Sequence, residues 1–307
     1  MLSYILRRLV TVVPTLFVVI TVAFFMMRLA PGGPFDSDRA LPPEIEKNIK
    51  ASYDLDKPLV QQYLIYLGRV LKGDFGPSLK IRDFSVNELI LEGAPASMQL
   101  GLSAIVLAVV FGVSLGTVAA LRQNSGIDFS VMSISMIGIA IPNFVMAPLL
   151  SLVIGVYLDL LPTSGWGGGA FQYKILPVIA LALPQIAYVA RLTRGSMVEV
   201  LNSNFVRTAR AKGLRERLVV VRHSLKAGMM PVVSYLGPAT AAVMTGSVVI
   251  ETIFGVPGIG TYFVNAALNR DYPLVMGVII VYAVLIMLLN LAVDLAYAVL
   301  DPKVRYS

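Results

Sequence analysis

Six long apolar runs, separated by polar stretches, set the pattern of this chain. Most of them are near or above the ~20 residues that an α-helix needs to cross a bilayer. The third run contains Pro142 and Pro148, so we expect a kink or a break in it. The pattern predicts an all-α membrane protein with six transmembrane helices, at residues 9–27, 98–121, 129–157, 175–190, 229–254 and 273–300.

The composition agrees with a membrane-embedded chain. Hydrophobic residues make up 57% of the 307 residues and charged residues 14%, against about 25% charged residues in soluble domains. The absence of cysteine excludes disulfides, thiolate metal sites and cysteine nucleophiles. The first apolar run is long for the core of a signal peptide and lacks a clean cleavage site, so we expect a retained membrane anchor.

Basic residues are distributed unevenly along the chain, which has a formal net charge of +7. Six spans place both termini and the segment 191–228 on one side of the membrane. Fourteen Lys and Arg lie on that side, against two on the other side when the long segment 28–95 is left out. Because positively charged loops stay in the cytoplasm, we predict that both termini are cytoplasmic, in a bacterial inner membrane. The excess of basic residues thus reports topology and not nucleic-acid binding.

The polar segment 28–95 then lies on the extracytoplasmic side. It carries nine basic and ten acidic residues, so it offers no patch for nucleic acid. We expect either a folded helical cap or a docking surface, and we divide the chain into residues 1–95 and a membrane core at 96–307. The helix starts in the polar segment are predicted at Pro43, at Pro58 and at the capping box Ser85–Glu88, and the stops at Gly73 and at Gly93–Pro95.

Residues 191–226 form the only long, strongly basic segment between two apolar runs. A passive link between membrane helices needs only a few residues, so this length indicates a function. Ser203 or Asn204 can cap a first short helix, and Gly213 supplies the left-handed residue that ends it. A second helix is predicted from the apolar spacing of Leu214, Leu218, Val221 and Leu225.

Two interpretations of this basic segment remain open. Its cations could hold an amphipathic helix against the head groups of membrane lipid. The segment could instead dock a soluble partner.

The fifth apolar run has features that weaken a regular helix. Pro238 and Gly246 permit bending, and Glu251 is an ionisable residue at membrane depth. All three are candidates for lining or gating a pathway. Glu251 could equally hydrogen-bond the backbone of the Gly/Pro-rich loop that follows it.

An intramembrane enzyme is the alternative from a different class. The single histidine, His223, lies in the basic segment, and the sequence has neither a His-Glu-x-x-His motif nor a phosphate-binding loop. Gly112-Val-Ser-Leu-Gly116 matches Gly-x-Ser-x-Gly, but it lies within a predicted helix and lacks the strand that a nucleophile elbow requires. We interpret these glycines as a site of close helix packing. A channel or receptor is a third alternative, and the sequence contains no ring-forming filter motif that would support it.

Several motifs resemble one family of transporters. Arg207-Thr-Ala-Arg-Ala-Lys-Gly213 is similar to the EAA loop of ABC-importer permeases, in the form found in peptide permeases. Arg207 and Thr208 stand where the general motif has Glu and Ala, and His223-Ser-Leu-Lys226 stands where it has Ile-x-Leu-Pro. Further segments resemble the B-type membrane subunit of oligopeptide ABC importers, in the dipeptide/oligopeptide/nickel permease family: Arg28-Leu-Ala-Pro-Gly32, Gly73-Asp-Phe-Gly-Pro-Ser78, Arg194-Gly-Ser-Met197, residues 250–260, Asn269-Arg-Asp-Tyr-Pro273 and Asp301-Pro-Lys303.

The resemblance implies a type I ABC importer permease fold and uptake of oligopeptides. Dipeptides, nickel and glutathione are the alternative substrates within the same family. The implied partners are a C-type permease subunit in a heterodimer, two cytoplasmic ATPase subunits that bind ATP and Mg²⁺, an extracytoplasmic peptide-binding protein and the peptide itself. No catalytic residue, cofactor or metal is expected on this chain. ATPase coupling is expected at Phe205, Arg207, Thr208, Ala209, Arg210, Ala211, Lys212, Gly213 and Leu214.

Overall fold

The computed structural model describes residues 2–29, 51 and 53–300, without the side chains of 2–9, 294 and 296–300. The predicted helix start at Pro43 lies outside the described residues. The chain divides into two compact units. The core unit comprises Ala96–Val256 and the chain from Ile286, and the N-terminal unit comprises Leu2–Pro95 and Pro257–Leu285.

The six predicted transmembrane helices are confirmed in the described part of the chain. Five helices are long and apolar enough to cross a membrane, and a bent pair makes a sixth span when its two halves are counted together. The bent pair joins α5 (Gly126–Ala140) to α6 (Asn143–Leu150) and the π-helix η1 (Ser151–Tyr157). The five single spans are α1 (Leu2–Leu29), α4 (Val86–Leu121), α7 (Phe171–Leu201), α11 (Met230–Phe254) and α13 (Tyr272–Leu300).

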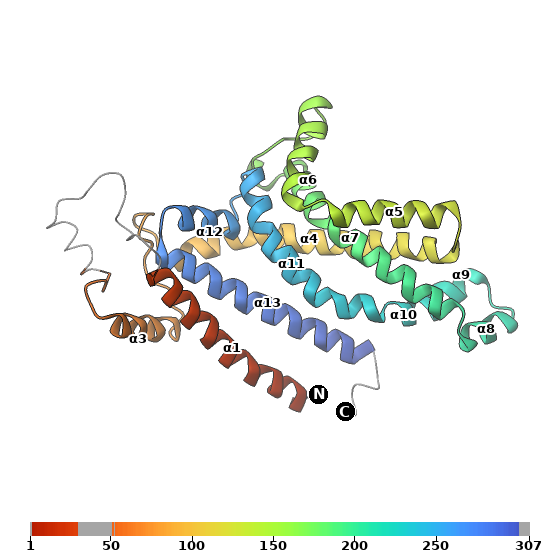
Figure 1. Cartoon of the computed structure of the whole chain (residues 1–307), viewed down its shortest axis with the longest axis horizontal. Helices are drawn as coiled ribbons and strands as arrows, with labels where there is room; N and C mark the ends of the chain where they lie inside the picture. Colours follow the sequence, from red (N-terminus) through yellow and green to blue (C-terminus); the bar gives the residue numbers. More distant parts are fainter. Residues whose placement is uncertain (1, 30–50, 52, 301–307) are drawn as a thin grey trace. The chain divides into compact units, whose positions relative to one another are not determined.

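The expected break in the third span occurs at Pro142. The helix axis bends by 104° between the two halves of this span, and the sharp turn between α5 and α6 is visible in Figure 1. Ile141 has an extended backbone with φ −86° and ψ 118°. A residue before proline avoids the helical region, so α5 ends before Ile141, and Pro142 is the N-cap residue of α6. Pro148, by contrast, lies inside α6.

The N-terminal unit adds two shorter helices, α3 (Leu59–Val70) and α12 (Ile259–Leu268), to α1 and to parts of α4 and α13. Pro58 precedes α3 as predicted, and Gly73, with φ +74°, follows its end. The core of this unit is formed by α4 packed against α12 and α13. Its buried apolar side chains are Val86, Leu89, Ile90, Ile259, Ala266, Leu274, Val275 and Val278.

The capping box before α4 is confirmed, but the predicted helix end is wrong. The Ser85 backbone N–H donates to Glu88 Oε2 at 2.8 Å, and the Glu88 N–H donates to Ser85 Oγ at 3.2 Å. The helix then continues through Gly93 and Pro95 to Leu121. Gly93 serves close packing, because a Cβ there would lie 2.9 Å from the backbone nitrogen of Ile259.

Asp271 joins two motifs of the N-terminal unit that are far apart in sequence. It is 1% exposed and accepts the backbone N–H groups of Leu79 at 3.1 Å and Lys80 at 3.3 Å. The Ser78 hydroxyl also donates to its carboxylate. Asp271 therefore fixes the loop at residues 73–80 against the start of α13.

The core unit is built around α7, which packs against both α5 and α11. Gly112 and Gly116 let α4 approach α7 closely. A Cβ at Gly112 would lie 2.6 Å from Val189 Cβ, and one at Gly116 would lie 2.7 Å from Thr193 Cβ. The interpretation of this pair as a packing site is therefore confirmed.

Candidate functional site

The basic segment after α7 folds into a chain of short helices (Figure 1). The first is α8 (Asn204–Ala211), which is followed by a turn at Gly213 with φ +75°. The predicted first helix and its end are therefore confirmed. Ser203 occupies the N-cap position, but its hydroxyl donates to the Val200 carbonyl at 2.6 Å and makes no capping bond. The remaining pieces are α9 (Glu216–Leu218), the π-helix η3 (Val219–Ser224) and α10 (Leu225–Gly228).

One side of α8 is buried within the loop itself. Val206 is 0% exposed and Ala209 is 6% exposed, and both pack with Val219 of η3. Val200 and Leu214 flank this small core. Ala209, which the resemblance placed among the coupling residues, therefore holds α8 to η3. A substitution at Ala209 would disturb the loop's own packing.

The other side of α8 is exposed. We call it the α8 face, and its most hydrophobic member is Phe205, which is 49% exposed. Aromatic residues and Arg are enriched at protein–protein interfaces. The α8 face consists of Phe205, Arg207, Thr208, Arg210, Ala211 and Lys212.

An ion pair spans the turn that separates α8 from α9. Arg210 Nε donates to Glu216 Oε2 at 3.1 Å, and a terminal nitrogen of Arg210 donates to Oε1 at 2.6 Å. This fork lowers the pKa of the Glu216 carboxyl and raises the pKa of the Arg210 guanidinium. Both side chains are more than a third exposed, so the pair orients the turn and adds little stability.

The predicted apolar face of the second helix is wrong. Leu218 is 42% exposed and Val221 is 59% exposed, whereas Val219 is fully buried and Val220 is 7% exposed. The cause is the π-helix η3, whose wider turn changes which residues face the core. The Ser224 hydroxyl donates to the Val219 carbonyl at 3.1 Å, five residues back along this helix.

An ion pair that the sequence analysis missed connects α5 to α7. Arg194 Nε donates to Asp128 Oδ1 at 3.0 Å, and a terminal nitrogen donates to Oδ2 at 2.7 Å. The Asn124 backbone N–H also donates to Asp128 Oδ2, at 2.9 Å. Asp128 is 2% exposed. The sequence shows an Arg and an Asp in apolar surroundings, which could have indicated a buried ion pair. Nothing in the sequence indicates that these two residues, 66 positions apart, contact each other.

The three candidate pathway residues lie along α11 and do not form one cluster. Pro238 is exposed, Gly246 is half-buried beside Asn143 and Leu181, and Glu251 is 0% exposed. Pro238 and Gly246 are eight residues apart, or about 12 Å along the helix. Among the described residues, no three His, Cys, Asp or Glu side chains come close enough to hold a metal ion.

The chain is similar over its full length to known permease proteins. The oligopeptide transport system permease protein OppB of Escherichia coli strain K12 is 55% identical over 306 residues, covering 100% of both chains. OppB of Haemophilus influenzae is 53% identical over 306 residues, again covering 100% of both chains. The dipeptide transport system permease protein DppB of Bacillus subtilis is 43% identical over 305 residues, covering 99% of this chain and 98% of its own.

A solved structure shares the fold. The crystal structure of an amino acid ABC transporter with histidines covers 71% of this chain and 94% of its own, with a TM-score of 0.51 and 16% identity. The fold is therefore that of a type I ABC importer permease. The N-terminal family of binding-protein-dependent transport membrane components matches residues 1–79. The family described as binding-protein-dependent transport system inner membrane component matches residues 112–306, and the chain belongs to this family of ABC transporter permeases.

Proposed function

We propose that this chain is the membrane permease subunit of an ATP-driven importer of oligopeptides. Relatives named for oligopeptide transport are 53–55% identical along the full length, whereas a relative named for dipeptide transport is 43% identical. This difference favours oligopeptides over the dipeptide alternative.

The functional unit contains several partners. A C-type permease subunit completes the membrane pathway, two ATPase subunits bind ATP on the cytoplasmic side, and a peptide-binding protein delivers the substrate from outside. Both termini and the loop at 191–228 face the cytoplasm, in agreement with the positive-inside rule. Residues 96–307 form the permease core, and residues 1–95 add the first span and an extracytoplasmic helical segment.

The exposed α8 face is the observation that carries the coupling role. Phe205 provides an apolar anchor, and the surrounding cations select an acidic groove on the ATPase subunit. Because Val206 and Ala209 fix α8 to η3, α8 moves with the helices on both sides of it. Movement of the ATPases is thereby transmitted to α7 and α10, and the Asp128–Arg194 pair passes it on to α5. Pro238 and Gly246 let α11 bend in response, and Glu251 supports the end of that helix.

Substrate choice is tested by uptake in proteoliposomes that contain the complete importer. We expect ATP-dependent uptake of a labelled tetrapeptide that unlabelled tetrapeptide suppresses and that an equal concentration of dipeptide, glutathione or Ni²⁺ leaves nearly unchanged. Uptake that dipeptide suppresses as strongly as tetrapeptide would assign the chain to the dipeptide alternative.

The coupling role is tested with Phe205→Ala, because this change removes an exposed ring without opening a cavity. We expect loss of ATPase subunits during purification of the permease pair, and loss of uptake, at an unchanged membrane level of the chain. Phe171→Ala is the matched control, since Phe171 is 79% exposed at the opposite end of α7. Full retention of the ATPases by Phe205→Ala would leave the lipid-surface interpretation of α8 in place.

A further inference from the structure

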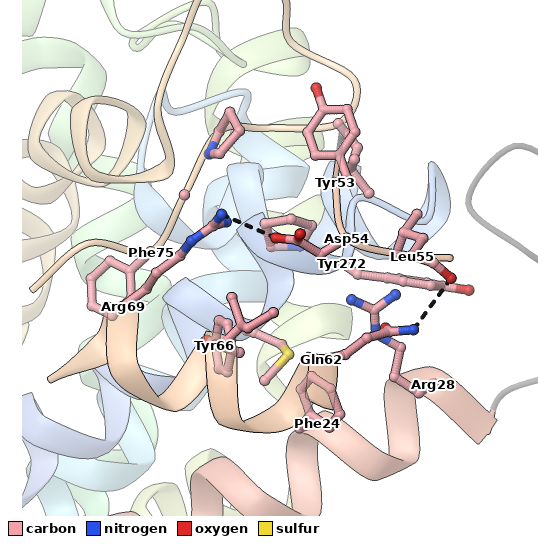
Figure 2. A pocket seen from close by; sticks show the side chains of 16 residues that line it. Phe24, Arg28, Tyr53, Asp54, Leu55, Gln62, Tyr66, Arg69, Phe75 and Tyr272 are labelled. Carbon is pink, nitrogen blue, oxygen red and sulfur yellow. Dashed lines mark hydrogen bonds and ion pairs between the residues drawn. The ribbon is translucent and has the colours of Figure 1, made fainter. Parts of the chain in front are cut away.

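A pocket in the N-terminal unit encloses a cation that has no carboxylate partner among the described residues (Figure 2). The cavity has a volume of about 60 Å³ and lies between α1, α3, the segment 53–55 and the start of α13. The cation is Arg28, at the end of α1. The residues that carry the argument are Phe24, Arg28, Asp54, Gln62, Tyr66 and Tyr272.

Arg28 is held in place by aromatic rings. Its guanidinium carbon lies 5.4 Å from the centroid of the Phe24 ring and 5.7 Å from that of Tyr272, so the charge has two π faces beside it. Its Nε is buried and has no hydrogen-bond partner in the described part of the chain. Arg28 as a whole is half-buried, so its guanidinium is partly desolvated and lacks a counter-charge among the described residues.

The acid that lines this pocket, Asp54, is already neutralised. A terminal nitrogen of Arg69 lies 3.2 Å from Asp54 Oδ2, and Lys57 Nζ lies 2.7 Å from Oδ1. Two cations therefore share one carboxylate, and Figure 2 shows the Asp54–Arg69 pair turned toward each other. The positive charge of Arg28 remains uncompensated by the described residues that line the cavity.

Gln62 and Tyr66 bring two further unsatisfied atoms into the same pocket. Gln62 is 8% exposed, and its Nε2 donates to the carbonyls of Lys57 at 2.7 Å and Leu55 at 3.3 Å. These bonds fix the orientation of the amide, and its Oε1 is buried without a partner among the described residues, as is the Tyr66 hydroxyl. The pocket thus offers donors from Arg28 and Tyr66 and an acceptor from Gln62. Buried polar atoms of this kind are normally satisfied, so their grouping indicates a ligand.

We infer that this pocket binds the carboxylate end of a peptide. The Arg28 fork matches a carboxylate, and the Tyr66 hydroxyl can donate to the same group. The N–H of the last peptide bond can donate to Gln62 Oε1. A single water needs about 10–15 Å³ of cavity volume. The cavity therefore takes a terminal group of a few atoms and not a whole peptide. An acidic side chain of a partner protein has no N–H beside its carboxylate, and Gln62 Oε1 would stay unpaired.

This inference rests on the proposed function, because it places the pocket on the side from which peptide arrives. It is tested with a labelled peptide as the free acid and as the C-terminal amide, in proteoliposomes that contain the whole importer. The variants are Arg28→Gln, which removes the charge, and Gln62→Glu, which adds a carboxylate to the lining of the pocket that holds Arg28. Lys72→Gln is the control, since Lys72 is an exposed cation near the end of α3 that does not line the pocket.

We expect both pocket variants to lower uptake of the free acid about tenfold while uptake of the amide stays at its wild-type rate. The control should change neither rate. An unchanged ratio of acid uptake to amide uptake in Arg28→Gln and Gln62→Glu would overturn the inference. The ratio stays unchanged if neither rate changes. It also stays unchanged if both rates fall together, as loss of protein docking or of folding predicts. ATP-dependent uptake of the amide by the variants distinguishes failure of this inference from failure of the proposed function. The proposed function fails only if no peptide is transported.

Discussion

Replacing either member of the Asp128–Arg194 pair should destabilise the core unit, and the two replacements should differ in size. Asp128 is 2% exposed and accepts both arms of the guanidinium, whereas the Arg194 side chain is 29% exposed. Arg194→Met therefore leaves a carboxylate buried without its cation. Asp128→Asn leaves a cation that water can still reach, and the amide oxygen can still accept the Asn124 N–H.

The structure places this pair between two known limits. Removing one partner of a fully buried pair costs about 3–5 kcal/mol, and an exposed pair contributes at most about 1 kcal/mol. Because Arg194 is partly exposed, we expect Arg194→Met to cost about 3 kcal/mol and Asp128→Asn about 2 kcal/mol. The double variant carries neither charge, so it should cost about 3 kcal/mol, which is less than the sum of the single costs and gives a coupling energy of about 2 kcal/mol.

The assay is thermal or denaturant unfolding of the purified permease pair in detergent, for the wild type, both single variants and the double variant. Arg191→Gln is the control, because Arg191 is an exposed cation on the same helix one turn earlier. Single costs that add within about 0.5 kcal/mol would refute the pairing. A larger cost for Asp128→Asn than for Arg194→Met would refute the burial argument.

Three further predictions test other parts of the fold. Asp271→Ala should destabilise the N-terminal unit by about 3 kcal/mol in thermal unfolding, because three donors of the loop at 73–80 lose their acceptor; an unchanged melting temperature would contradict this. Gly213→Val should reduce ATPase co-purification through backbone strain of about 1–2 kcal/mol, since φ is +75° and no atom would clash, while Gly213→Asn should be tolerated; equal behaviour of the two variants would exclude strain. Gly116→Ala should lower the amount of folded protein in fluorescence-detected gel filtration because the added methyl meets α7, whereas Gly195→Ala meets no atom within 4 Å and should not; equal yields would contradict the close packing.

The membrane spans and the main turns were predictable from the sequence because each depends on local chemistry. Apolar length predicts the spans, the Ser85–Glu88 spacing predicts a capping box, and Gly213 predicts a left-handed turn. Each signal acts within a few residues of the structure it determines. The end of α4 shows the limit of such reasoning. Gly93 and Pro95 are local stop signals, yet tertiary packing against α12 keeps the helix continuous.

The features that the sequence could not predict depend on contacts between distant segments. The π-helix η3 moves Val219 and Val220 inward, and a periodicity of 3.6 residues cannot reveal this shift. The pairing of Asp128 with Arg194 and the bonds from residues 78–80 to Asp271 span 66 and about 190 positions. Their residue types were visible in the sequence, but their partners were not. The exposed α8 face was predictable as a basic helix, whereas the burial of Ala209 required the fold of η3.

The central claim, that the α8 face lies in the cytoplasm against an ATPase subunit, is tested most directly with a single cysteine at Thr208. The chain contains no cysteine of its own, and Thr208 is exposed on α8. We predict that Thr208→Cys in intact cells reacts with an impermeant thiol reagent only after permeabilisation, and that a short thiol cross-linker joins it to an ATPase subunit. Arg82→Cys, in the N-terminal unit, should react without permeabilisation. Labelling of Thr208→Cys from outside, or a cytoplasmic Thr208→Cys that forms no cross-link to the ATPase, would contradict the account.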